Sequence, residues 1–195
     1  MSEQRSVSRR TALAGLGGGG IGLALGAGST GASAGARTGA VADHPLTGVW
    51  LAMVTLPATP DVTVAVPGLY GADGSVVLSF PPSQVGPMGV QLRSPAVGTW
   101  KAVDESTGHF TVVQTLSSVD GEYLGSVTIE GYPSVNADGQ TFEDQNPDNV
   151  TTIRDASNTI VATIEGGSPN PVLGMRMGPG NAGFPELPGE ATPAT

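Results

Sequence analysis

Glycine and proline punctuate this chain so often that a long amphipathic helix has no room to form. The 195 residues include 30 Gly and 16 Pro, and both types weaken or interrupt helices. Between the interruptions, apolar residues recur with period two, as in residues 125–130 (GSVTIE) and 160–165 (IVATIE). Period two is typical of strands with one buried face. The sequence therefore predicts an all-β fold for residues 43–177.

Turn residues separate these runs at short intervals. Asp73-Gly74, Asp120-Gly121, Asp138-Gly139 and the segment 155–158 (DASN) contain Gly, Asn and Asp, which accept the positive φ angles that tight hairpins require. We expect about eight antiparallel strands, the last two interrupted, in a meander that closes into an up-and-down barrel without exposed edges. The expected strands are 47–56, 62–71, 75–80, 96–104, 109–119, 122–132, 140–153 and 159–177.

Two segments of the mature chain fall outside this strand pattern. Residues 81–95 contain four prolines, and we interpret them as a long loop that could cover one barrel mouth. Residues 178–195 are rich in Gly and Pro, and we expect them to form a disordered tail.

The first 42 residues resemble an export signal. A polar start with Arg5, Arg9 and Arg10 leads into a weakly apolar run of small residues, and 40–42 (AVA) is a small-residue cleavage pattern. Residues 8–13 (SRRTAL) resemble the twin-arginine export motif. A second pattern at 32–34 (ASA) is an alternative cleavage point. We expect an extracellular or periplasmic, cell-envelope location. The Gly-rich run does not favour a stable membrane anchor.

The charge and the missing cysteines exclude several functions. Without residues 1–42, four basic residues stand against sixteen acidic ones, a net charge of −12. Nucleic acids need a basic footprint, so we expect no nucleic-acid partner. Absence of Cys removes thiol nucleophiles and zinc–thiolate sites. We expect no cofactor, and the oligomeric state stays open.

Two G-x-W motifs carry the clearest resemblance to known proteins. Gly48-Val49-Trp50 opens the first expected strand, and Gly98-Thr99-Trp100 opens a strand in mid-chain. The first motif resembles that of the calycin, or lipocalin-like, barrels. In that family an Arg from the last strand packs across the Trp, and the resemblance assigns this place to Arg176. It implies that Gly48, Trp50, Trp100 and Arg176 help to close the barrel.

The order of the motifs is also similar to a group of mostly uncharacterised exported bacterial barrels. The matching pieces are 44–50 (HPLTGVW), Asp73-Gly74, 98–100 (GTW) and 120–125 (DGEYLG). Allene oxide cyclase and dirigent barrels are more distant look-alikes. These resemblances imply a fold and say little about activity.

The residue types needed for catalysis are scarce. Residues 43–195 contain two histidines, His44 and His109, and no G-x-S-x-G elbow. We interpret His44 as part of a flexible terminus and His109 as a strand-edge residue. The run from Asp144 to Asp155 mimics a calcium loop but lacks its Gly and Glu, so we favour a solvated turn and predict no metal site.

These observations do not identify ligand-binding residues. We expect a non-catalytic barrel that binds a small apolar ligand inside, because eight-stranded barrels either fill with side chains or hold one small molecule. Two alternatives stay open. One is an enzyme of the cyclase or isomerase kind, and the other is a structural or interaction module with a filled core.

Overall fold

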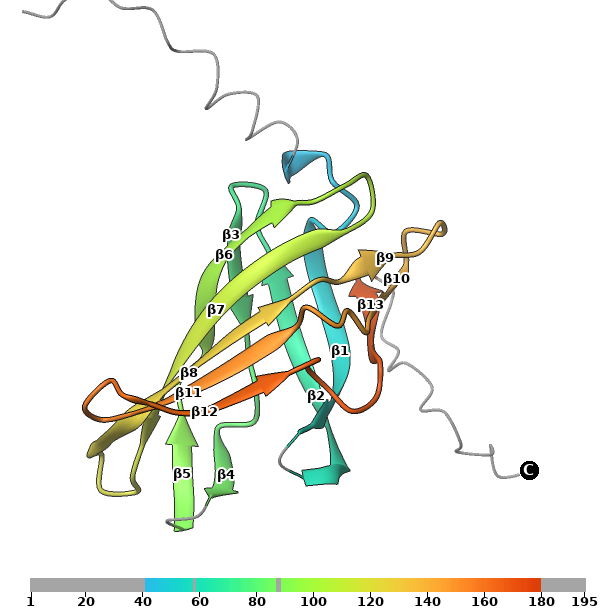
Figure 1. Cartoon of the computed structure of the whole chain (residues 1–195). Helices are drawn as coiled ribbons and strands as arrows, with labels where there is room; N and C mark the ends of the chain where they lie inside the picture. Colours follow the sequence, from blue (N-terminus) through green and yellow to red (C-terminus); the bar gives the residue numbers. More distant parts are fainter. Residues whose placement is uncertain (1–40, 58, 87–88, 180–195) are drawn as a thin grey trace, which may run out of the picture. The chain divides into compact units, whose positions relative to one another are not determined.

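The computed structural model describes residues 41–57, 59–86 and 89–179, and these residues form one antiparallel β-sheet (Figure 1). The all-β prediction is therefore confirmed. Most of the expected export signal and the tail beyond residue 179 lie outside the described residues. The strands are β1 (Gly48–Leu56), β2 (Thr59–Tyr70), β3 (Ser75–Leu78), β4 (Ser83–Gly86), β5 (Gly89–Arg93), β6 (Ala96–Ala102), β7 (Gly108–Ser117), β8 (Tyr123–Gly131), β9 (Ser134–Val135), β10 (Thr141–Asp144), β11 (Val150–Asp155), β12 (Ile160–Glu165) and β13 (Val172–Met177).

The sheet curls into a half-barrel that stays open on one side. Its strand order is β12-β11-β8-β7-β6-β3-β2-β1-β13-β10-β9, with the β4–β5 hairpin joined to β7 through β5. The prediction of about eight strands in a closed barrel is wrong on both points, since the sheet has 13 strands and an edge at each end of its order. The sheet nevertheless surrounds an interior, as Figure 1 shows.

The open side follows from the segment that joins β12 to β13. Gly166 and Gly167 have φ angles of +76° and +68°, which belong to a turn and not to an extended strand. Pro169 and Pro171 follow, and proline has no N–H to donate to a neighbouring strand. Consecutive β12 and β13 therefore do not pair, and β13 pairs with β1 and β10 instead.

The predicted loop at 81–95 is also wrong, because it contains the β4–β5 hairpin. Gln84 pairs with Gln91 and Val85 with Val90, and β5 continues onto β7. Three of the four prolines lie outside the two strands: Pro81 and Pro82 precede β4, and Pro95 follows β5. Pro87 lies outside the described residues. Pro82 contributes only its carbonyl, which accepts the Arg93 N–H at 2.8 Å.

Most of the expected tight turns are confirmed. The Asp73-Gly74 turn joins β2 to β3 and Asp120-Gly121 joins β7 to β8, with φ angles of +85° at Gly74 and +86° at Gly121. At the β11–β12 turn, Asn158 takes a φ of 64°. Asn tolerates this left-handed conformation better than most residues.

The interior is filled at one end. We call the end next to residues 41–47 the upper end and the end with the β4–β5 hairpin the lower end, as in Figure 1. The core gathers toward the upper end and is built mainly from the G-x-W strands and their neighbours. It consists of Leu46, Trp50, Ala52, Val66, Tyr70, Val76, Leu78, Ala96, Trp100, Phe110, Val112, Val135 and Phe142. In the described part of the chain, no helix has the length and hydropathy needed to span a bilayer.

Candidate functional site

The lower part of the half-barrel encloses an apolar cavity of about 1030 Å³. Alternate residues of each strand face it, since successive side chains point to opposite sides of a sheet. Val54 of β1, Val64 of β2 and Ile129 of β8 line it, and each is only partly buried. Further apolar lining comes from Leu56, Val62, Phe80, Leu116, Val127, Ile153, Ile164 and Val172.

Aromatic rings form the inner end of the cavity, where it meets the packed core. Tyr70 packs edge-on against Phe110, with ring centroids 6.0 Å apart, and Trp50 packs edge-on against Phe142 at 5.1 Å. All four side chains line the cavity. Edge-to-face contacts of this kind hold aromatic rings in defined positions. The cavity therefore has an ordered aromatic end above apolar walls.

The first G-x-W motif brings together the residues that the calycin resemblance named. The Arg176 guanidinium carbon lies 4.3 Å from the Trp50 ring centroid, and the Trp50 indole donates to the Leu46 carbonyl at 2.7 Å. Gly48 has a φ of +137°, and a Cβ there would lie 2.8 Å from Arg176 Nη1. A side chain at Gly48 would thus displace the guanidinium.

Arg176 also ties three segments together. Its Nε donates to the Gly139 carbonyl at 2.7 Å and its Nη1 to the Thr47 carbonyl at 2.9 Å, while Nη2 donates to the Pro45 carbonyl. These bonds join β13 to the β9–β10 turn and to residues 41–47. The planar guanidinium of Arg176, whose N–H donors point in fixed directions, therefore connects these segments at the upper end.

The second G-x-W motif lies beside the first in space. The Trp100 indole donates to the Gly71 carbonyl at 2.9 Å, and the ring packs edge-on against Tyr70 and His44. A Cβ at Gly98 would lie 1.9 Å from the Thr111 carbonyl oxygen, so close pairing of β6 with β7 requires Gly at this position. The resemblance assigned a role to Trp100, and the structure explains why Gly is needed at position 98.

His44 differs from its interpretation as a flexible terminal residue. It is buried, its Nδ1 accepts the Leu46 N–H at 3.1 Å, and its Nε2 lies 3.1 Å from the Asp104 carbonyl. This arrangement requires the tautomer with the proton on Nε2. The histidine is thus occupied in holding residues 41–47 against the β6–β7 turn.

Four of the polar side chains that line the cavity lie on β4, β5 and β7. Gln91 and Arg93 of β5, Gln114 of β7 and Gln84 of β4 all line it. The Gln84 amide donates to Gln91 Oε1 at 3.3 Å. In contrast, Gln114 Oε1 and Arg93 Nε are buried and have no hydrogen-bond partner within the described residues. Sequence reasoning missed Gln84, Gln91 and Arg93 because it treated 81–95 as a loop, and it did not single out Gln114 in the expected strand 109–119.

A buried carboxylate faces the cavity from β10. Asp144 Oδ2 accepts the Tyr132 N–H at 2.9 Å, and Oδ1 accepts from the Asn149 amide at 2.8 Å and the Asn146 N–H at 3.3 Å. Burial raises the pKa of Asp144 despite these bonds. Burial, together with the charge of Asp144, also raises the pKa of Tyr70. The three donors show that Asp144 fixes the β10–β11 connection.

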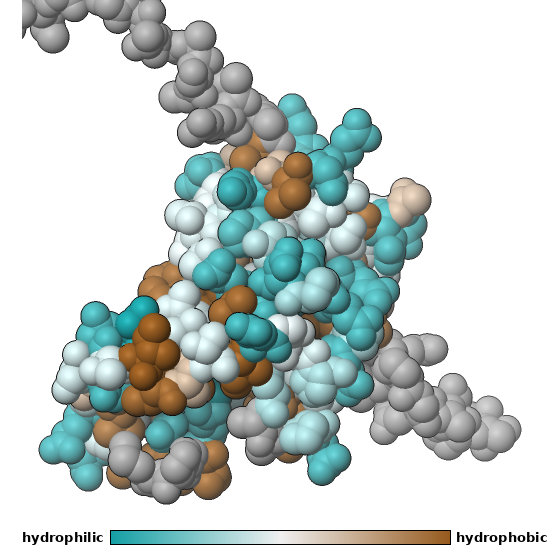
Figure 2. Space-filling model, viewed as in Figure 1, coloured by the Kyte–Doolittle hydropathy of each residue, from teal (hydrophilic) through white to brown (hydrophobic). Residues whose placement is uncertain are grey.

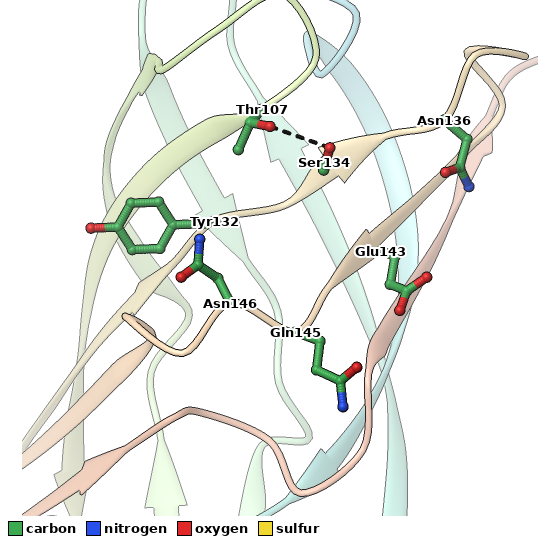
Figure 3. A pocket seen from close by; sticks show the side chains of 7 residues that line it. All are labelled: Thr107, Tyr132, Ser134, Asn136, Glu143, Gln145 and Asn146. Carbon is green, nitrogen blue, oxygen red and sulfur yellow. Dashed lines mark hydrogen bonds between the residues drawn. The ribbon is translucent and has the colours of Figure 1, made fainter.

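A second, smaller pocket of about 380 Å³ lies on the outside of the sheet (Figure 3). Thr107 donates to Ser134 at 3.2 Å on one side of it, as Figure 3 shows. Nearby, His109 stacks on Tyr132 with centroids 4.3 Å apart and lies 3.4 Å from Glu130. The lining is polar, from Thr107, Tyr132, Ser134, Asn136, Glu143, Gln145 and Asn146.

The calcium-like run does not gather its acidic side chains around one point. Asp144 is bound by the three N–H donors described above, and Asp155 Oδ1 accepts the N–H groups of Ser157 and Thr159, both at 2.9 Å. Residues 41–179, outside the gaps at 58 and 87–88, contain no group of three or more metal-ligating side chains. Asp155 therefore serves as a turn residue within the part described.

Comparison with known proteins does not assign the chain to a family: no protein-family model, no curated protein and no solved structure matches it.

Proposed function

We propose that this protein is an exported, non-catalytic barrel that binds a small, largely apolar molecule inside its half-barrel. One observation carries the proposal: apolar side chains that face inward are left only partly buried. Val54, Val64 and Ile129 line the cavity and are only partly buried. Each Å² of apolar surface that a ligand covers contributes about 25 cal/mol, so this surface favours an apolar occupant.

The size of the cavity supports the same proposal. Its volume of about 1030 Å³ lies at the upper end of the range of about 300–1,000 Å³ that is usual for small-molecule sites. The packed aromatic residues close one end of the cavity. Because β12 and β13 do not pair with each other, the half-barrel keeps an open side through which a ligand could pass. Export rests on residues 1–42 and remains part of the proposal.

Native mass spectrometry of the protein from its own host tests this function. We expect an added mass that is released on unfolding. The Val64→Trp variant fills the cavity and should lose the added mass, whereas Leu69→Trp should keep it, because Leu69 is 44% exposed on the other face of β2. An added mass that survives Val64→Trp would place the ligand elsewhere and contradict the proposal.

A further inference from the structure

The β5 strand has its polar and apolar faces reversed. Gln91 and Arg93 face the cavity, whereas Val90 and Leu92, which alternate with them, are 49% and 38% exposed on the outside. A strand on a cavity wall normally turns its apolar residues inward. Val85, which pairs with Val90 in the hairpin, is 82% exposed and also lies at the border of the cavity. Apolar side chains are also visible on the surface toward the lower end in Figure 2.

Arg93 faces the cavity and makes no ion pair within the described residues, although the carboxylates of Glu130, Asp144 and Asp155 also line that cavity. Within the described residues, the salt-bridge contacts consist of the His109–Glu130 pair, so no carboxylate there pairs with Arg93. Its Nε is buried and has no hydrogen-bond partner. Burial lowers the pKa of the guanidinium, because a cation loses hydration there. Arg93 is only partly buried, but the part of its charge that loses hydration costs free energy until a partner compensates it.

Gln114 provides the second unsatisfied group. It is 2% exposed, and its Oε1 has no partner within the described residues. Arg93 pairs with Leu116 across the β5–β7 ladder, and Gln114 is the next residue of β7 on the same face. Diagonal neighbours on one sheet face are about 7–8 Å apart, within reach of long side chains. One small group can therefore contact both side chains.

We propose that the ligand of the cavity carries a carboxylate, which Arg93 and Gln114 bind while the apolar body extends toward the aromatic end. The inference rests on the proposed function. Arg93 would donate to the carboxylate through Nε and a terminal nitrogen, the fork geometry that guanidinium groups favour. A half-turn of the Gln114 amide presents Nε2 as a further donor. The single positive charge of Arg93 matches a monoanion better than a phosphate.

Displacement of a neutral fluorescent dye tests this assignment. N-phenyl-1-naphthylamine fluoresces when it binds in an apolar cavity. Dodecanoic acid and 1-dodecanol compete with the dye for the cavity; they have the same alkyl chain length and differ in the polar group, a carboxylate or a hydroxyl. We expect the acid to bind the wild type about tenfold or more tightly than the alcohol, the range of a charged hydrogen bond. In Arg93→Gln this preference should disappear. Lys101→Gln removes one charge from an exposed site and should keep it.

The outcomes separate the two proposals. The carboxylate assignment would be wrong if acid and alcohol displaced the dye equally well, or if the preference for the acid persisted in Arg93→Gln. Either result would leave the proposed binding function of the cavity intact. Absence of dye binding in a folded wild type would contradict the binding function itself. Restoration of the acid preference in Arg93→Lys would show that charge at this place, and not packing, carries it.

Discussion

The guanidinium of Arg176 on β13 covers the ring of Trp50 on β1, with its carbon 4.3 Å from the ring centroid. The two residues are far apart in sequence but directly paired in the β1–β13 ladder. Arg176 also binds the carbonyls of Pro45, Thr47 and Gly139, so it joins three segments at the upper end of the half-barrel. Arg176 thus pairs with Trp50 in the ladder, stacks on its ring and binds three carbonyls of other segments.

Replacing Arg176 should therefore destabilise the fold more than replacing another arginine. We expect Arg176→Met to lower the free energy of unfolding by about 3 kcal/mol, from three lost hydrogen bonds and a lost cation–π contact. Arg154→Met is the matched control, because Arg154 makes a single bond, to the Asn158 carbonyl. Urea denaturation measures both, and equal losses would contradict the role assigned to Arg176.

The Gly of the second G-x-W motif should tolerate no side chain. In Gly98→Ala, the new Cβ would overlap the Thr111 carbonyl oxygen, 1.9 Å away, and force β6 from β7. We expect a loss of at least about 3 kcal/mol, since overpacking of this severity exceeds ordinary core changes. Gly178→Ala, whose Cβ would meet nothing within 4 Å, is the control. A urea midpoint for Gly98→Ala equal to that of the wild type would show that β6 and β7 can move apart at little cost in free energy.

The Gln114 side chain should strengthen ligand binding but lower the stability of the ligand-free protein, compared with an apolar side chain at the same position. Gln114→Met replaces an unsatisfied buried amide with an apolar side chain of similar length, so the ligand-free protein should gain about 1 kcal/mol. The same variant should bind dodecanoic acid more weakly. Gln91→Met is the comparison, because it breaks the 3.3 Å bond from Gln84 and should not gain stability. Thermal unfolding and dye displacement measure the two effects, and a less stable Gln114→Met would contradict the prediction.

Three turn aspartates should make the protein sensitive to acid. Hydrogen bonds lower the pKa of Asp73, Asp104 and Asp138 below the usual 3.8, chiefly from Ser75, from the Ser106 N–H and from the Gln140 N–H respectively. A lowered folded-state pKa contributes stability above the unfolded value of 3.8, and this contribution is lost as the pH falls through the folded pKa.

The measurement is the urea midpoint at decreasing pH below 3.8. The variant with all three aspartates changed to Asn should lose less stability over this range than the wild type. Asp144 acts in the opposite direction, because burial raises its pKa and its protonation favours the folded state. Asp61→Asn, an exposed change on β2, should follow the wild type. Parallel curves for the triple variant and the wild type would contradict the prediction.

The position at which the proposed export signal is cleaved should affect the stability of the remaining chain. The Val41 carbonyl accepts the His44 N–H at 3.2 Å and the Thr47 hydroxyl at 2.5 Å, and its side chain packs on the core. We expect a chain that begins at Gly35 to be more stable than one that begins at Asp43 by about 1–2 kcal/mol. Thermal unfolding compares the two chains, and equal midpoints would show that Val41 contributes nothing.

The sequence by itself determined the local structure of this protein. Period-two runs predicted strands, and Asp-Gly and Asn residues predicted the turns at Gly74, Gly121 and Asn158, because these features depend on neighbouring residues and on allowed φ angles. The resemblance to calycin barrels also pointed to Trp50 and Arg176, which the structure places in contact.

Only the tertiary structure decided how the strands meet around the interior. The Gly166–Gly167 turn and the prolines after it keep β12 from pairing with β13, but the choice of β1 and β10 as the partners of β13 depends on how the whole sheet curves. The pairing of Arg93 with Leu116 sets Arg93 beside Gln114. The β5 strand turns its polar side chains toward the cavity and its apolar ones outward, which is the reverse of the usual orientation. Long-range register brings these residues together, so the candidate site depends on contacts between distant segments.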